Sequence, residues 1–146
     1  EKLMLLSAVR DPGNLGTIVR SAAAFGFDRL ILSDDCADLY HPRTLRGAMG
    51  ALFRIRADIV SDFASAVTAL RASGRRVYAA ELREGALAVD AVAPTAADCF
   101  VIGNEGHGIA PTLSALCTGS VYIPIAPTSE SLNAATAASI LAYIQR

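Results

Sequence analysis

Two loops in the second half of the chain carry the side chains best suited to chemistry. The apolar run Cys99–Ile102 is followed by Gly103-Asn-Glu-Gly-His-Gly108, and the run Val121–Ile125 is followed by Ala126-Pro-Thr-Ser-Glu-Ser-Leu-Asn133. Such runs are typical of buried strands, and the loops after parallel strands meet at the edge of an α/β sheet where ligands bind. Glycines let backbone amides approach a ligand closely. The sequence therefore predicts one pocket built from both loops.

A third polar loop lies near the beginning of the chain. Asp11-Pro-Gly-Asn14 follows the apolar run Leu3–Val9 and precedes the helical pattern of Leu15–Phe25, which includes Arg20. The loop is either an ordinary strand–helix turn or part of the pocket. Arg20 is either a surface arginine or a cation directed at the same site.

The elements needed to position these loops alternate between strands and helices. This alternation predicts an α/β fold, with a mainly parallel six-stranded sheet and helices on both faces. The expected strands are Leu3–Val9, Arg29–Leu32, Ala51–Ile59 with its flanks, Arg76–Ala80, Asp98–Ile102 and Val121–Ile125. The expected helices are Leu15–Phe25, a short helix opened by His41-Pro42 that runs to Ala48, Asp62–Ala72, Pro111–Leu116 and Leu132–Ile144. Gly85–Val92 is ambiguous and is compatible with a turn of helix.

Composition limits the class of protein. With 146 residues, 53% hydrophobic and 18% charged, the chain is expected to form a single domain, residues 1–146, with a real core. No apolar run reaches the roughly 18 residues of a membrane span, and no signal peptide opens the chain. The three cysteines have no metal-ligand spacing, so we expect no metal site and a cytoplasmic protein.

The charge distribution is uneven, although the net charge is only −1. Between Tyr40 and Ala57 the chain has His41 and four arginines, at positions 43, 46, 54 and 56, and no acid. This basic segment is either a solvated helix face with its following strand or a patch that faces phosphates.

Read in order, the three loop regions resemble the three motifs of the SpoU (TrmH-like) branch of the SPOUT RNA methyltransferases. They are Asp11–Gly26, Val101–Gly108 and Ile123–Asn133, and Leu45–Arg54 resembles the linking region of that family. The resemblance covers almost the whole chain. It implies a C-terminal deep trefoil knot, an exception to the rule that chains do not knot. It also implies S-adenosyl-methionine (AdoMet) as cofactor, a homodimer with a shared active site, and 2′-O-methylation of ribose in ribosomal or transfer RNA.

The resemblance also implies roles for individual residues. By this resemblance, the catalytic residues of the family correspond to Arg20, Asn14, Glu105, Ser131 and Asn133. Its cofactor-binding set corresponds to Ile102, Gly103, Asn104, Gly108, Ile123, Pro124, Ile125, Ser131, Leu132 and Ala134. Its RNA-binding set corresponds to Arg10, Arg20, Arg43 and Arg46. Arginine stays protonated in proteins, so we hypothesise that Arg20 clamps a phosphate and orients the 2′-oxygen rather than acting as a general base.

Several simpler interpretations stand beside these roles. Glu105 could only cap the amides of its own loop, His107 could be a rim residue rather than a base, and Ser131 could be the N-cap of the last helix. Pro127 stands where the family commonly has glycine, which removes an amide donor. Many members also carry an N-terminal RNA-binding domain, and we expect none within these 146 residues.

Other functions fit the sequence less well. The alternative to an enzyme is a non-catalytic RNA-binding or scaffold protein of the same fold. The glycines at 103, 106 and 108 have the wrong order and place for a dinucleotide-binding fingerprint. No G-x-S-x-G elbow of a serine hydrolase is present, and no P-loop.

Overall fold

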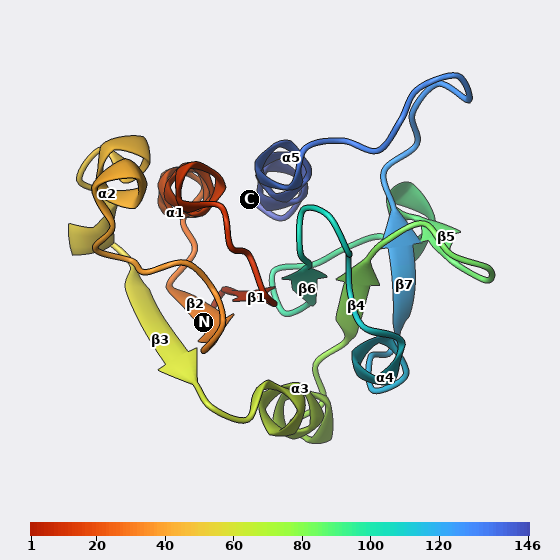
Figure 1. The fold of residues 1–146 in the computed structure, drawn as a ribbon. Helices are drawn as coiled ribbons and strands as arrows, with labels where there is room; N and C mark the ends of the chain where they lie inside the picture. Colours follow the sequence, from red (N-terminus) through yellow and green to blue (C-terminus); the bar gives the residue numbers. More distant parts are fainter.

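A parallel seven-stranded sheet lies between two layers of helices in the computed structural model, which describes residues 1–146 (Figure 1). The strand order is β3-β2-β1-β6-β4-β7-β5, and every neighbouring pair is parallel. The strands are β1 (Leu3–Leu6), β2 (Arg29–Ser33), β3 (Arg56–Val60), β4 (Val77–Ala80), β5 (Leu87–Ala88), β6 (Cys99–Ile102) and β7 (Gly119–Tyr122). The carboxyl ends of all strands therefore share one edge of the sheet.

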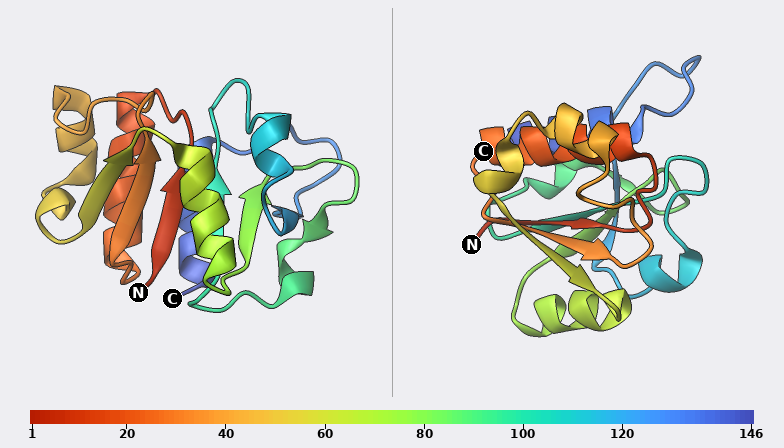
Figure 2. Two further views of the ribbon diagram at one scale, coloured as in Figure 1. Left: turned by 90° about the horizontal axis from the view of Figure 1, so that it is seen from below. Right: turned by 60° about the vertical axis from the view of Figure 1, so that its left-hand side comes forward.

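Three helices cover one face and two cover the other (Figures 1 and 2). The first group is α1 (Pro12–Ala24), α2 (Pro42–Ala48) and α5 (Ala134–Ile144), and the second is α3 (Phe63–Ala72) and α4 (Pro111–Ser114). Two 3₁₀ turns, η1 (Ala51–Phe53) and η2 (Val89–Val92), complete the chain. No helix has both the length and the apolar character needed to cross a membrane.

The central strands are buried on both faces, which is why their sequences are continuous apolar runs. All four residues of β1 and of β6 are buried. α1 begins where the sequence has its turn residues: the Asp11 carboxylate accepts a hydrogen bond from the Asn14 backbone N–H at 2.9 Å, and Pro12 occupies the first turn. The buried stripe of α1 is Leu15, Ile18, Val19 and Ala22.

α1 and α2 pack through glycine. A Cβ atom on Gly16 would lie 2.4 Å from the carbonyl oxygen of Thr44 and 3.0 Å from both the Ala48 nitrogen and the Gly47 Cα. Only glycine at position 16 allows the two backbones to come this close.

The α/β architecture is confirmed, but several predicted elements have other bounds. β1 ends at Leu6 rather than Val9, and α1 begins at Pro12 rather than Leu15. The sheet has seven strands rather than six, because the two-residue strand β5 precedes the expected turn of helix within Gly85–Val92, which is η2. The expected strand Ala51–Ile59 is η1 followed by β3, since Met49 and Gly50 have positive φ of 51° and 81° and break the chain direction. The last strand is Gly119–Tyr122 rather than Val121–Ile125. The last helix begins at Ala134 rather than Leu132, and its N-cap is Asn133 rather than Ser131.

Candidate active site

A chain of hydrogen bonds joins the three polar loops at the carboxyl edge of the sheet. The Asn133 side-chain amide donates to Asn14 Oδ1 at 3.1 Å, and Asn14 Nδ2 donates to Glu105 Oε2 at 3.4 Å. Glu105 Oε1 in turn accepts the Arg10 backbone N–H at 2.8 Å. Residues from the first, second and third motifs thus form one connected polar cluster, named here the Asn14–Glu105–Asn133 cluster.

The loop that carries Glu105 is held by the side chain of Asn104. Its Nδ2 donates to the Ala8 carbonyl at 2.7 Å, and its Oδ1 accepts the backbone N–H groups of Gly106 and His107 at 2.9 Å each. Ala8 has a φ of +54°, a strained conformation for a residue with a side chain. The loop closes tightly, because a Cβ on Gly103 would lie 2.6 Å from Ile109 Cγ1.

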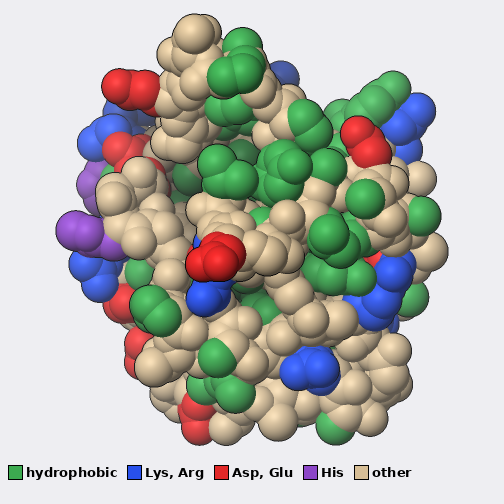
Figure 3. Space-filling model, turned by 90° about the vertical axis from the view of Figure 1, so that its right-hand side faces the viewer, with side chains coloured by type: hydrophobic (Ala, Val, Ile, Leu, Met, Phe, Trp, Pro, Cys, Tyr) green, Lys and Arg blue, Asp and Glu red, His purple; other side chains and the backbone are tan.

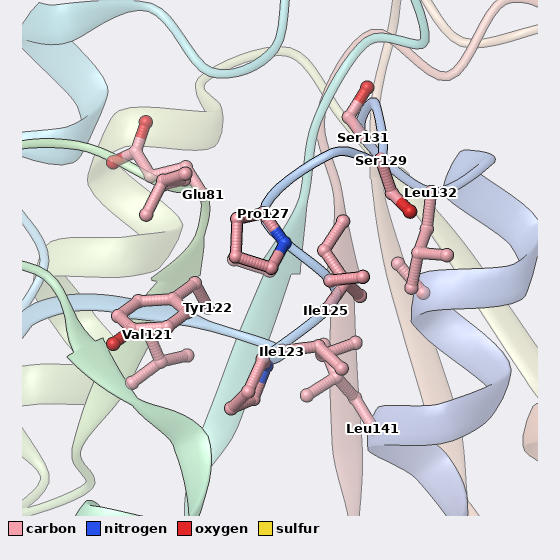
Figure 4. A pocket seen from close by; sticks show the side chains of 15 residues that line it. Glu81, Val121, Tyr122, Ile123, Ile125, Pro127, Ser129, Ser131, Leu132 and Leu141 are labelled. Atoms are coloured by element: carbon pink, nitrogen blue, oxygen red, sulfur yellow. The ribbon is translucent and has the colours of Figure 1, made fainter.

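An apolar cavity of about 530 Å³ lies beside the carboxyl ends of β4 and β7. The segment after β7 forms much of its wall, and Leu132 and Leu141 lie on the side away from Glu81 (Figure 4). On the face that carries β7 and β5, hydrophobic side chains gather below a projecting loop (Figure 3). The lining residues are Ala80, Glu81, Leu82, Val121, Tyr122, Ile123, Pro124, Ile125, Ala126, Pro127, Ser129, Ser131, Leu132, Ala137 and Leu141.

A second, polar hollow of about 400 Å³ lies at the ends of β1, β2 and β6. Arg10, Asp35 and His107 are among the residues that line it. Arg10 and Asp35 form an ion pair at 3.1 Å. A hydrogen bond from the Ser33 hydroxyl at 2.6 Å is the main reason why the pKa of Asp35 lies below its ordinary value, and Arg10 lowers it further.

The structure divides the predicted cofactor-binding residues into three groups. Ile123, Pro124, Ile125, Ser131 and Leu132 line the apolar cavity. Asn104 and Gly108 line the polar hollow. Ile102 is buried in β6, Gly103 closes its loop, and Ala134 begins α5, so these three line neither space.

Of the predicted catalytic residues, three meet and two stand apart. Asn14, Glu105 and Asn133 form the cluster described above, and Ser131 lies in the cavity wall. Arg20 is exposed on α1 and makes no side-chain hydrogen bond or ion pair within the chain. Six residues of helix place it about 9 Å further along the axis than Asn14.

The predicted RNA-binding arginines are all exposed. Arg43 lies 3.6 Å from Asp11 in an ion pair, whereas Arg46 has no carboxylate partner. Tyr40, at the start of the basic segment, and Phe53, within it, are 74% and 94% exposed.

Sequence reasoning missed the part of the cavity that comes from β4 and α5. Ala80, Glu81 and Leu82 follow a strand that pairs with β7, and Ala137 and Leu141 face the cavity from α5. Ligands bind at the carboxyl ends of parallel strands, and this rule also applied to the predicted strand Arg76–Ala80. Glu81, an acidic residue directly after that strand, could have indicated that this loop contributes to the site.

The fold and the site together define an α/β protein with a cavity and a polar cluster at the carboxyl edge of a parallel sheet. The chain belongs to the SpoU rRNA Methylase family, whose model matches residues 2–143.

Known relatives cover nearly the whole chain. It is 39% identical over 142 residues to the 23S rRNA (guanosine(2553)-2'-O)-methyltransferase RlmP of Bacillus subtilis, covering 97% of this chain and 56% of that protein. It superposes with a TM-score of 0.83 on the SpoU methyltransferase AviRb of Streptomyces viridochromogenes in complex with AdoMet, at 33% identity, covering 97% of this chain and 55% of that one. The chain spans about half the length of the curated relatives it matches.

No group of three or more His, Cys, Asp or Glu side chains is placed to hold a metal ion.

Proposed function

We propose that this chain transfers the methyl group of AdoMet to the 2′-hydroxyl of a ribose in ribosomal or transfer RNA. The observation that carries the proposal is the Asn14–Glu105–Asn133 cluster, which brings all three motifs together at the sheet edge that also carries the apolar cavity. The names of the relatives support the same chemistry.

The cavity fits an adenosyl cofactor. A volume of about 530 Å³ lies within the ~300–1,000 Å³ of small-molecule pockets, and an apolar lining with few polar groups suits a flat base. Ile123, Ile125 and Leu132 would hold the base, and exposed backbone groups of the same segment would hydrogen-bond its edge. Bound AdoMet would supply an already activated methyl group, so that alignment of the acceptor oxygen gives much of the rate.

The polar cluster would fix the geometry around the acceptor. Glu105 ties the first loop to the second, and Asn14 transmits that position to Asn133 at the start of α5. In this proposal Arg20 contacts the phosphate beside the target ribose, because its planar fork binds phosphate oxygens in pairs.

RNA would lie on the exposed arginines. Arg10, Arg43 and Arg46 are the phosphate contacts we propose, and exposed Phe53 offers a face on which an unpaired base can stack. Replacement of Arg46 by alanine should weaken RNA binding and reduce its salt dependence, as measured by titration at several salt concentrations.

We also propose a homodimer whose site is shared. Within one chain Arg20 faces solvent and does not reach the Asn14–Glu105–Asn133 cluster. A second copy that packs against the exposed side of α1 would bring its own Arg20 to that cluster.

The path of the C-terminal segment supports the trefoil knot that we expect. After β7 the chain returns over the sheet, and α5 lies against α1, with the hydroxyls of Ser21 and Ser139 2.7 Å apart (Figure 1). If the chain is knotted, stretching it from both ends after unfolding should leave it shorter than an unknotted chain of equal length. A full extended length would contradict the knot.

We propose further that residues 1–146 act as one catalytic domain in the cytoplasm. The three cysteines are unpaired, as is usual in a reducing compartment. Imaging of the tagged protein in its own cells tests the compartment.

The decisive experiment combines cofactor binding with product mapping. We expect AdoMet to bind in calorimetry, and radiolabelled methyl groups to pass to RNA from a strain that lacks the protein, at one mapped 2′-O position. AdoMet binding without transfer to ribosomal or transfer RNA would contradict the proposal. RNA binding without any AdoMet binding would instead indicate the non-catalytic scaffold.

A further inference from the structure

Glu81 is the only charged residue in the lining of the apolar cavity. It directly follows β4, and its backbone N–H donates to the Val121 carbonyl at 2.9 Å. Its side chain is 17% exposed and lies across the cavity from Leu132 and Leu141 (Figure 4). A carboxylate in such surroundings is costly unless hydrogen bonds compensate it.

Two serine hydroxyls stabilise the Glu81 carboxylate by hydrogen bonds, and both donate to the same carboxylate oxygen. Ser114 Oγ and Ser120 Oγ both donate to Glu81 Oε2, each at 2.7 Å. Arg83 Nη1 lies 3.6 Å from the same oxygen. No protein group donates to Oε1. The carboxylate is thus fixed in position while one of its oxygens keeps its full capacity to accept hydrogen bonds.

We propose that Glu81 Oε1 accepts a hydrogen bond from a ribose hydroxyl of the adenosyl cofactor, which makes Glu81 a positioning residue that selects a ribonucleoside. This inference rests on the proposed function. The apolar wall across the cavity suits the base, whereas the ribose carries hydroxyl donors without charge. A carboxylate is the acceptor that other nucleotide-binding α/β proteins use for ribose hydroxyls, and a charged acceptor makes such a bond strong.

Ligands that differ by one hydroxyl test the assignment. Dissociation constants of adenosine, 2′-deoxyadenosine and 3′-deoxyadenosine are measured by competition against S-adenosyl-homocysteine on the full chain. We expect at least one deoxy compound to bind the unchanged protein about tenfold more weakly than adenosine, the effect of one charged hydrogen bond. If both bind as tightly as adenosine, the assignment is wrong, whatever the variants do.

The variant Glu81→Gln gives the second arm. It should weaken adenosine, S-adenosyl-homocysteine and AdoMet to a similar extent, about tenfold, and reduce the difference between adenosine and its deoxy forms. A loss confined to AdoMet would show that Glu81 faces the sulfonium, and would overturn the ribose assignment. Arg83→Ala, which removes a neighbouring charge but keeps the carboxylate, is the matched control and should leave all constants within about twofold.

The two proposals fail in distinguishable ways. If the unchanged protein binds no adenosyl compound, the proposed function fails and the inference falls with it. If it binds AdoMet and methylates RNA but tolerates both deoxyadenosines, only the role of Glu81 is refuted.

Discussion

The side chain of Asn133 does two things that one substitution can separate. Its Oδ1 caps α5 by accepting the N–H groups of Ala135 and Thr136 at 2.8 and 3.2 Å, while its Nδ2 donates to Asn14. Aspartate caps helices as well as asparagine does and suits the helix dipole. It cannot donate, however. If the Asn14 side chain turns so that its Nδ2 donates to the new carboxylate, Asn14 Oδ1 then faces the Glu105 carboxylate. The hydrogen bond from Asn14 to Glu105 is lost in that arrangement.

Asn133→Asp should therefore keep stability and lose activity. We expect the free energy of unfolding to stay within about 0.5 kcal/mol, and kcat/KM for methyl transfer to fall by at least about tenfold. Urea unfolding and methyl-transfer kinetics measure the two quantities. Asn133→Ala is the control, since it should lower both. An Asn133→Asp variant with full activity would mean that the link to Asn14 does not matter for the reaction.

Asp98 is a buried carboxyl whose ionised form is held by hydrogen bonds. Burial raises the pKa of this carboxyl, but the hydrogen bonds from Arg76, at 2.9 and 2.6 Å, and from the Thr95 backbone outweigh burial, so its pKa in the folded protein lies below the ordinary value. Arg76 also donates to the Val92 carbonyl, and Gln145 donates to the Asp98 carbonyl. The pair thus ties β4, β6 and the end of α5 together.

The pKa of Asp98 is lower in the folded than in the unfolded protein. Ionised Asp98 therefore stabilises the fold at pH values above its unfolded pKa of about 3.9, and this stabilisation is lost as the pH falls through its folded pKa. Asp98→Asn should cost about 2 kcal/mol of unfolding free energy at pH 7, and the difference from the unchanged protein should shrink below about pH 4. Urea unfolding between pH 3 and 7 measures it. A difference that stays constant down to pH 3 would contradict the ionic origin.

At the scale of elements, the sequence predicted whether a segment is a helix or a strand better than it predicted the residues at which each element begins and ends. Helical periodicity and turn residues located α1, α2 and α3 to within a few residues, since each has a capping or terminating residue that can be read locally. The run Val121–Ile125 looked like a strand, but Pro124 has no N–H for a sheet ladder, and β7 ends at Tyr122. The remaining residues of that run form the cavity wall instead. β5 has only two residues, too few to show any periodicity.

The same limit applies to the site, because local sequence patterns identify the residues of a motif but not the distant residues that they contact. The three motifs identified the residues of the polar cluster, but Asn14 and Asn133 are 119 positions apart, and no local pattern states that their side chains touch. The Glu81 contacts to Ser114 and Ser120 depend on the order β4-β7 in the sheet, which only the fold supplies.

The crossing of α1 and α2 gives a prediction at this scale. Gly16→Ala would force a methyl group to within 2.4 Å of the Thr44 carbonyl, which is backbone and cannot turn away. We expect a loss of about 3 kcal/mol in the free energy of unfolding, measured in urea, even though alanine favours a helix.

Gly47→Ala is the matched control on the facing helix. Its Cβ would lie 3.3 Å from both the Gly13 oxygen and the Gly16 Cα, a contact that small shifts can relieve. This variant should lose no more than about 1 kcal/mol. Equal losses in both variants would mean that the crossing adjusts freely, contrary to the packing described here.

At the scale of the whole molecule, the position of Arg20 decides how many chains make one site. A shared site predicts that two inactive variants restore each other. Arg20→Ala and Glu105→Ala should each reduce methyl transfer strongly, because each damages both sites of a homodimer. In a mixed dimer, one site would contain both changes and the other would contain neither.

Mixing the two variants under conditions that let subunits exchange should therefore restore activity. If subunits pair at random, half of the dimers are mixed and each has one intact site, so about a quarter of the original activity returns. The measurement is methyl transfer before and after exchange, with the mass of the complex followed by light scattering. The double variant Arg20→Ala, Glu105→Ala mixed with an equal amount of unchanged protein is the control. This mixture starts at half of the original activity, and exchange should lower it to about a quarter if the site is shared, because mixed dimers then retain no intact site. Activity that stays at a half in the control, or no recovery in the first mixture of proven dimers, would place Arg20 and Glu105 in the same chain's site.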